Sequence, residues 1–119
     1  MISERDRPRY KLKFPSSMSN RSEYLQFTEA GALLVEAERK ADCRNERLTW
    51  IKPADTQTFL DSIGEQNRRP EFEYGEPTHE TKAMLRRLIK QFGSTEDLLR
   101  CWRIIRIKPQ RIFWPDSSD

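Results

Sequence analysis

Basic side chains recur at helical spacings in the last third of this 119-residue chain. Lysines and arginines stand four residues apart in one run and three apart in the next, so each run lies along one face of a helix. Cations on a helix face are suited to contact phosphates, which supply much of the affinity in nucleic-acid binding. The pattern predicts a surface that binds DNA or RNA. Its residues are Lys82, Arg86, Arg87, Lys90, Arg100, Arg103 and Arg106.

A second candidate surface is acidic and aromatic. Residues 53–81 hold seven acidic residues against two basic ones, whereas residues 82–119 hold four against nine. The acidic segment can pack beside the basic one, or it can face a protein partner, where aromatic residues dominate the energetics. The alternative function is therefore a protein-interaction module: a subunit of a larger assembly, or an inhibitor or nucleic-acid mimic that blocks a partner's surface. Its predicted residues are Glu71, Phe72, Glu73, Tyr74 and Trp114.

The sequence offers little for catalysis or metal binding. His79 is the one histidine and stands among acidic residues, so neither a Ser/His/Asp relay nor a multi-histidine metal site is expected. Only four glycines occur, and none belongs to a phosphate-cradling run. We predict a protein that is not an enzyme, with no cofactor, no metal and no small-molecule substrate.

Cysteine usage and hydropathy bear on location. Cys43 and Cys101 are too few for a disulfide framework. The first residues lack the apolar core of a secretory signal, and no stretch approaches the roughly 18 apolar residues of a membrane span. We expect a cytoplasmic protein without a membrane partner.

The elements that position these residues are predicted to be mainly helical. From Ser22 to Ala41, apolar residues recur at spacings of three and four, which predicts a long helix with Gly31 in its middle. A shorter helix is predicted from residue 55 or 56 to residue 64, where proline precedes it and glycine ends it. Short strands are predicted at 9–14 and 48–51.

Two further helices carry the basic residues. Thr78 is a favourable N-cap, and Gly93 is placed to end the helix that Thr78 begins. Ser94 with an acidic residue three positions later then forms a variant of the capping box. The basic faces are thus expected on two helices joined by a tight turn.

The stretch Leu85–Leu99 resembles the helix-hairpin-helix units of DNA-repair and DNA-processing proteins, in which a Phe-Gly-Ser turn such as 92–94 precedes a Leu-Leu pair. The resemblance implies that amides of the turn bind phosphate. The family's DNA-contacting turn has two glycines, however, and this chain has one. A helix-turn-helix that places the helix from Thr95 in the major groove is a second interpretation.

One domain is expected from the length and composition. Hydrophobic residues make up 35% and charged residues 34%, which predicts a thin core. The predicted fold is mainly α, with about four helices, one or two short accessory strands, and a C-terminal helix-turn-helix or helical-hairpin-like pair. The domain is expected to span 9–114, between flexible tails at 1–8 and 115–119.

Overall fold

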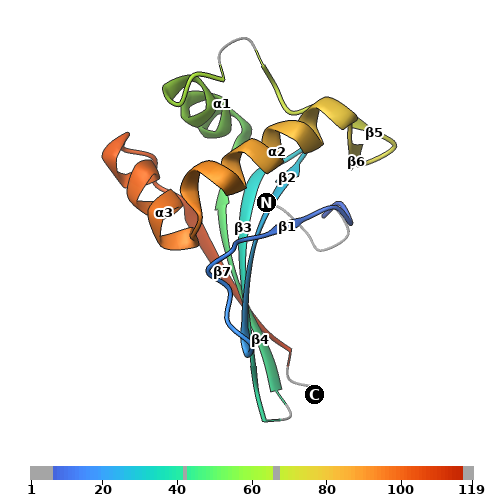
Figure 1. Cartoon of the computed structure of the whole chain (residues 1–119), viewed down its shortest axis with the longest axis vertical. Helices are drawn as coiled ribbons and strands as arrows, with labels where there is room; N and C mark the ends of the chain where they lie inside the picture. The colour runs from blue at the N-terminus through green and yellow to red at the C-terminus, as the bar shows by residue number, and fades with distance from the viewer. Residues whose placement is uncertain (1–6, 42, 66–67, 117–119) are drawn as a thin grey trace.

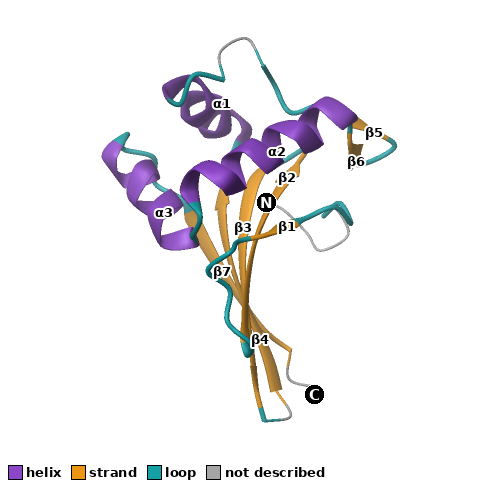
Figure 2. Ribbon diagram, viewed as in Figure 1, coloured by secondary structure: helices purple, strands orange, loops and turns teal. Residues whose placement is uncertain are grey.

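The computed structural model describes residues 7–41, 43–65 and 68–116. These residues form, in chain order, β1 (Leu12–Lys13), β2 (Arg21–Thr28), β3 (Gly31–Lys40), β4 (Cys43–Ile51), α1 (Pro53–Ser62), β5 (Phe72–Glu73), β6 (Glu76–Pro77), α2 (His79–Phe92), α3 (Thr95–Ile104) and β7 (Gln110–Asp116). Five strands build one antiparallel sheet in the order β1-β2-β3-β4-β7, and β5 and β6 form a separate hairpin. The three helices lie over one end of the sheet, and the long strands extend beyond them (Figures 1 and 2).

The prediction of a mainly helical domain is wrong, because a five-stranded sheet organises the fold. The segment 22–41, expected to be one helix, forms the hairpin of β2 and β3, in which Leu25 stands opposite Leu34. Those two side chains belong to the core beneath the helices, whereas Leu33 and Val35 are buried in a second cluster on the other face. A strand buried on both faces is a continuous apolar run, which also contains the spacings that indicate a helix.

Gly31 begins β3 and is not the middle of a helix. Its φ of 129° lies in a region that L side chains rarely adopt, and a Cβ at this position would overlap the carbonyl oxygen of Ile51. Glycine is therefore required where β3 passes close to the end of β4.

The main core lies between the helices and the sheet. Phe59 of α1 lies at its centre, with its ring centroid 5.7 Å from that of Phe92 and 5.9 Å from that of Trp102. Because these rings come from α1, α2 and α3, one aromatic cluster holds the three helices together. The other fully buried side chains of this core include Phe14, Leu25, Phe27, Leu34, Ile51, Leu60, Leu85 and Leu98.

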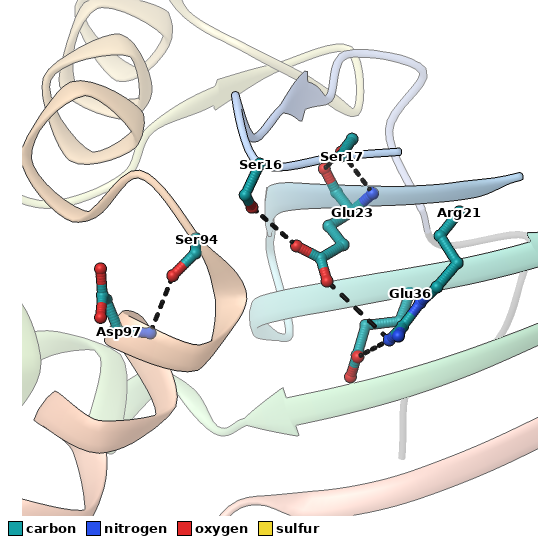
Figure 3. Close-up of polar contacts among 7 residues, drawn as sticks. All are labelled: Ser16, Ser17, Arg21, Glu23, Glu36, Ser94 and Asp97. Atoms are coloured by element: carbon teal, nitrogen blue, oxygen red, sulfur yellow. Dashed lines mark hydrogen bonds and ion pairs between the residues drawn. The ribbon is translucent and has the colours of Figure 1, made fainter. Parts of the chain in front are cut away.

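The helices predicted from capping patterns are confirmed. Thr78 caps α2, and Gly93 ends it with a φ of 73°. Ser94 caps α3 by accepting a hydrogen bond from the Asp97 N–H at 3.1 Å (Figure 3). The short helix expected at 55–64 exists as α1, but its predicted cap is wrong: the helix runs from Pro53 to Ser62, and its N-cap is Lys52, which makes no side-chain cap hydrogen bond. The signals at Thr78, Gly93 and Ser94 were readable because each connects residues three or four positions apart.

The remaining strands differ in extent from the predictions. The strand expected at 48–51 is the end of β4, and the one expected at 9–14 is reduced to the two residues of β1. The polar connection between α1 and α2 contains the hairpin of β5 and β6. The segment after α3 adds β7 to the sheet beside β4.

The predicted tails, 1–8 and 115–119, lie mostly outside the described residues. Within the first, Arg7 donates hydrogen bonds to Oε1 of Gln26 at 3.2 Å and to Oε1 of Glu46 at 2.6 Å. These contacts tie the start of the described chain to β2 and β4.

Candidate anion-binding groove

A groove of about 500 Å³ lies between the end of α3 and the beginning of β7. Four exposed basic residues line it: Arg103, Arg106, Lys108 and Arg111. The rest of its lining is apolar and consists of Leu99, Ile107 and Pro109. None of the described residues that line the groove is acidic. We refer to these seven residues as the cationic groove.

The turn after α3 brings the first two cations to the groove. Arg106 has a φ of 64°, in the left-handed region, which costs a residue other than glycine on the order of 1 kcal/mol. Two backbone hydrogen bonds fix this turn, from the Arg106 N–H to the Arg103 oxygen at 3.1 Å and from the Ile107 N–H to the Trp102 oxygen at 2.9 Å. Ile107 is buried in the main core, so it anchors the turn while the neighbouring cations face solvent.

Pairing of β7 with β4 supplies the remaining basic wall. Arg111 stands opposite Thr49 of β4, which is buried on the helix-covered face of the sheet. Paired residues of antiparallel strands project to the same face, so Arg111 lies on the side of the sheet where α3 packs. Clustered cations without an acidic neighbour in the lining create a positive potential that attracts anions.

The seven predicted basic residues do not form one surface but lie at several separate places in the structure. Arg103 and Arg106 lie together in the cationic groove. Lys82 and Arg86 instead contact Tyr10: the Lys82 Nζ lies 4.8 Å from the ring centroid, and Arg86 donates a hydrogen bond of 3.4 Å to the phenol oxygen. These two side chains help to hold the N-terminal segment against α2.

Arg87 is engaged within the fold. It donates hydrogen bonds to both carboxylate oxygens of the buried Glu65, at 2.8 and 3.1 Å, while Arg68 donates a third at 3.0 Å. The hydrogen bonds from Arg87 are the main reason that the pKa of Glu65 lies below its usual value, and the same contact raises the pKa of Arg87. Arg87 therefore joins the segment after α1 to α2.

The last two predicted cations are on helix surfaces outside the cationic groove. Arg100 lies 3.8 Å from Glu96 and 3.5 Å from Asp97, and all three side chains are exposed. Such exposed pairs contribute little stability. Lys90 is exposed in the last turn of α2 and forms no ion pair with the described residues.

Lys108 and Arg111 were missed by the sequence analysis. They follow the end of α3 and do not continue its spacing of three, so helical periodicity could not include them. A strand prediction for residues 110–116 would have helped to find them. The strand β7 pairs with β4, and this pairing places Arg111 in the same groove as Arg103 and Arg106.

The turn between α2 and α3 offers a poorer environment for phosphate. Glu96 and Asp97 stand in the first turn of α3, and their charges oppose an anion at this helix N-terminus. The Asp97 N–H is already taken by Ser94 (Figure 3). The resemblance to helix-hairpin-helix units places phosphate at this turn, whereas the basic side chains gather at the other end of α3.

Another polar cluster joins the loop before β2 to β2 and β3 (Figure 3). Ser16 donates a hydrogen bond to Glu23 at 3.0 Å, and Arg21 lies 3.9 Å from Glu23 and 3.3 Å from Glu36. The shared arginine offsets the charge of the two glutamates. We interpret the cluster as a cross-strand network that holds the loop before β2.

A cleft of about 460 Å³ lies between the start of α1 and the turn that joins β2 to β3. Its charged lining residues are Glu29 and Arg69, one of each sign. The cationic groove differs because all its charges have one sign.

The predicted partner-binding residues lie mainly on the β5–β6 hairpin. Glu71 and Glu73 are exposed, Phe72 packs partly against the main core, and Tyr74 is 99% exposed at the tip. The backbone of Trp114 belongs to β7, but its side chain lies outside the described residues.

The described part of the chain holds neither a cluster of metal-ligating side chains nor a membrane-spanning helix. It contains no group of three or more His, Cys, Asp and Glu side chains that could hold a metal ion. None of its helices combines the length and the apolar character needed to cross a bilayer. Comparison of the chain with protein-family models, curated proteins and solved structures found no match.

Proposed function

We propose that this chain is a non-catalytic nucleic-acid-binding protein of the cytoplasm, which contacts the phosphate backbone of DNA or RNA through the cationic groove. The observation that carries the proposal is the convergence of Arg103, Arg106, Lys108 and Arg111 on one groove whose described lining contains no acidic residue. Lys90 is a further exposed cation on the neighbouring helix.

The type of cation supports phosphate as the ligand. Three of the four basic residues are arginines, whose planar guanidinium groups donate two parallel hydrogen bonds to a phosphate. All four are exposed, so they can follow a continuous strand. Phosphate contacts of this kind bind without reading the base sequence.

Salt dependence tests the proposal quantitatively. If the four cations neutralise four phosphates, log K should fall against log salt with a slope of about −3.6 for duplex DNA or about −2.8 for a single strand. Between about 50 and 200 mM salt, the affinity should then fall about 150-fold or about 50-fold respectively. Fluorescence anisotropy with labelled duplex and single-stranded oligonucleotides measures both slopes. Failure to bind either oligonucleotide at the lower salt concentration would refute the proposal.

Charge-reversal variants locate the site. Arg103→Glu combined with Arg106→Glu should abolish binding, because two contacts are lost and two repulsions are added. Arg39→Glu is the matched control: Arg39 is exposed near the end of β3, at the turn into β4 that lies far from α3 (Figure 1). The single variants Arg39→Glu and Arg106→Glu change the charge by the same amount. If both lose the same affinity for the oligonucleotide, the binding surface lies outside the groove.

The alternative, a protein-interaction module, is favoured by one specific observation, the almost complete exposure of Tyr74. An aromatic side chain presented in this way is a common anchor at protein interfaces.

A further inference from the structure

Tyr74 presents its ring to solvent at the tip of the β5–β6 hairpin. It is 99% exposed, so its ring contributes almost no burial. Tyr74 and Gly75 form a two-residue turn between the paired residues Glu73 and Glu76. Tyr74 and Gly75 have φ values of 53° and 80°, and a tight two-residue hairpin turn of type I′ requires positive φ at both positions, so the turn itself accounts for the backbone conformation.

The hairpin that presents Tyr74 is fixed at its base. The Glu76 carboxylate accepts hydrogen bonds from the backbone N–H groups of Arg9 at 2.8 Å and Tyr10 at 3.3 Å. The Thr81 hydroxyl accepts from the Glu71 N–H at 2.7 Å and donates to the Glu71 oxygen at 3.0 Å. A tip held in this way loses little conformational entropy on binding.

The chemistry around the ring defines what the tip can bind. The carboxylates of Glu71 and Glu73 are exposed on the hairpin, and residues 71–80 include four acidic residues and no lysine or arginine. Arg7 and Arg9 line a hollow beside Tyr74 together with Glu29 and Glu76, so charges of both signs meet there, and the acidic excess belongs to the edge that Glu71 and Glu73 form. A complementary surface must offer an apolar place for an aromatic ring and cations around that place. Nucleic acid does not meet this requirement, because its backbone repels carboxylates.

The cationic groove meets this requirement. Leu99 and Pro109, both half-buried, provide apolar contacts for a ring, and the surrounding arginines can pair with carboxylates or stack on the phenol. The hairpin and α3 lie on opposite sides of the molecule (Figure 1), so the tip cannot reach the groove of its own chain.

We propose that the β5–β6 tip of one copy docks into the cationic groove of a second copy. The contact is head-to-tail, so a pair of copies leaves one tip and one groove free, and further copies can add to form open chains or a closed ring. A hairpin tip in a groove forms a small interface, which makes the contact weak and transient. The tip occupies the surface proposed to bind nucleic acid, so oligonucleotide and second copy exclude one another.

Sedimentation equilibrium over a concentration series tests this association. At about 50 mM salt, the weight-average mass should rise with concentration above the 14.2 kDa of one chain, and it should return to that value at about 500 mM salt. Tyr74→Ser and Arg106→Glu should each abolish the rise. Met18→Ser is the matched control, because Met18 is also an exposed apolar residue and lies outside both surfaces, and it should leave the rise unchanged.

Mixing the two defective variants is the decisive measurement. Tyr74→Ser keeps a working groove, and Arg106→Glu keeps a working tip. The tip of the second variant can therefore dock into the groove of the first, but no further copy can add to this pair. The mixture should therefore reach at most twice the mass of one chain, although each variant alone stays monomeric. A wild type that remains monomeric at low salt and high concentration, or a mixture that remains monomeric, would overturn the proposal.

The result is separable from the nucleic-acid proposal. Tyr74→Ser leaves the groove intact, so it should bind oligonucleotides at least as tightly as the wild type while it fails to self-associate. Self-association without oligonucleotide binding would refute the proposed function alone. Oligonucleotide binding by a strictly monomeric wild type would refute the docking alone.

Discussion

Replacement of Glu65 by glutamine should weaken the attachment of the segment after α1 to α2. The Glu65 side chain is only 11% exposed and accepts three hydrogen bonds, two from Arg87 and one from Arg68. Glutamine preserves the size of the side chain but removes its charge. Its amide nitrogen is a donor, and it would face guanidinium groups that also only donate.

The magnitude follows from the burial of the partners. Hydrogen bonds to a charged group contribute about 1.5–3 kcal/mol when they are desolvated, whereas exposed ion pairs contribute about 0–1 kcal/mol. Here the carboxylate is buried, but the side chains of Arg87 and Arg68 are 44% and 56% exposed, so water screens the cations. We therefore expect Glu65→Gln to lower the free energy of unfolding by about 1–2 kcal/mol near neutral pH.

The loss should depend on pH in a defined direction. Hydrogen bonding from Arg87 is the largest cause that lowers the pKa of Glu65 below 4.5; burial opposes it, and the charges of both arginines reinforce it. A group with a lower pKa in the folded state stabilises the protein above its unfolded pKa, and this contribution disappears as pH falls through the folded value. The difference between wild type and Glu65→Gln should therefore be complete well above pH 4.5 and shrink below it.

Urea denaturation followed by circular dichroism measures this difference at neutral and acidic pH. Glu73→Gln makes the same chemical change at an exposed carboxylate, and it should alter stability by less than about 0.5 kcal/mol. Combining Glu65→Gln with Arg87→Met should cost less than the sum of the single substitutions, because both remove one interaction. A loss that is equal at both pH values, or strictly additive in the double variant, would refute the reasoning.

Three further predictions concern individual residues. Gly31→Ala should lower the free energy of unfolding by at least about 3 kcal/mol in denaturant titration, because the added Cβ overlaps the Ile51 carbonyl; a near-neutral effect would contradict the close approach. Gly93→Ala meets no atom within 4 Å, so only the left-handed conformation should matter, and a loss of about 1 kcal/mol is expected in the same titration. Burial raises the pKa of the Cys101 thiol, so iodoacetamide should modify the exposed Cys43 before Cys101. Mass spectrometry of the alkylated protein measures this order, and faster modification of Cys101 would contradict its burial.

The helices that carry the basic residues could be predicted because their signals are local. Thr78, Gly93 and Ser94 act on backbone groups within one helical turn of themselves, and such contacts do not depend on the rest of the fold. Arg103 was predicted by the same kind of regularity, a repeat of three along α3. The same repeat predicted Arg106 on that helix face, which is wrong, because α3 ends at Ile104 and Arg106 stands in the left-handed turn that follows. The caps and Arg103 would be expected in any fold that keeps α2 and α3.

The hairpin of β2 and β3 could not be recognised in the same way. Its residues include strong helix formers, and its apolar positions satisfy helical spacing because both faces of the sheet are covered. Which faces are covered depends on segments far along the chain, among them Phe59 and Leu85. Burial on both sides is a property of the assembled layers, and a single segment carries no sign of it.

The sequence by itself determined α2, α3, the approximate place of α1 and the basic character of the last third, because helix caps and side-chain spacing act over three or four residues. Tertiary structure alone decided which cations are available. Glu65 engages Arg87 from 22 positions away, and pairing of β7 with β4 brings Arg111 beside Arg103 and Arg106. Ion pairs and strand ladders between distant segments depend on how the whole chain packs, so charge counting could indicate a cationic surface but could not assemble the groove.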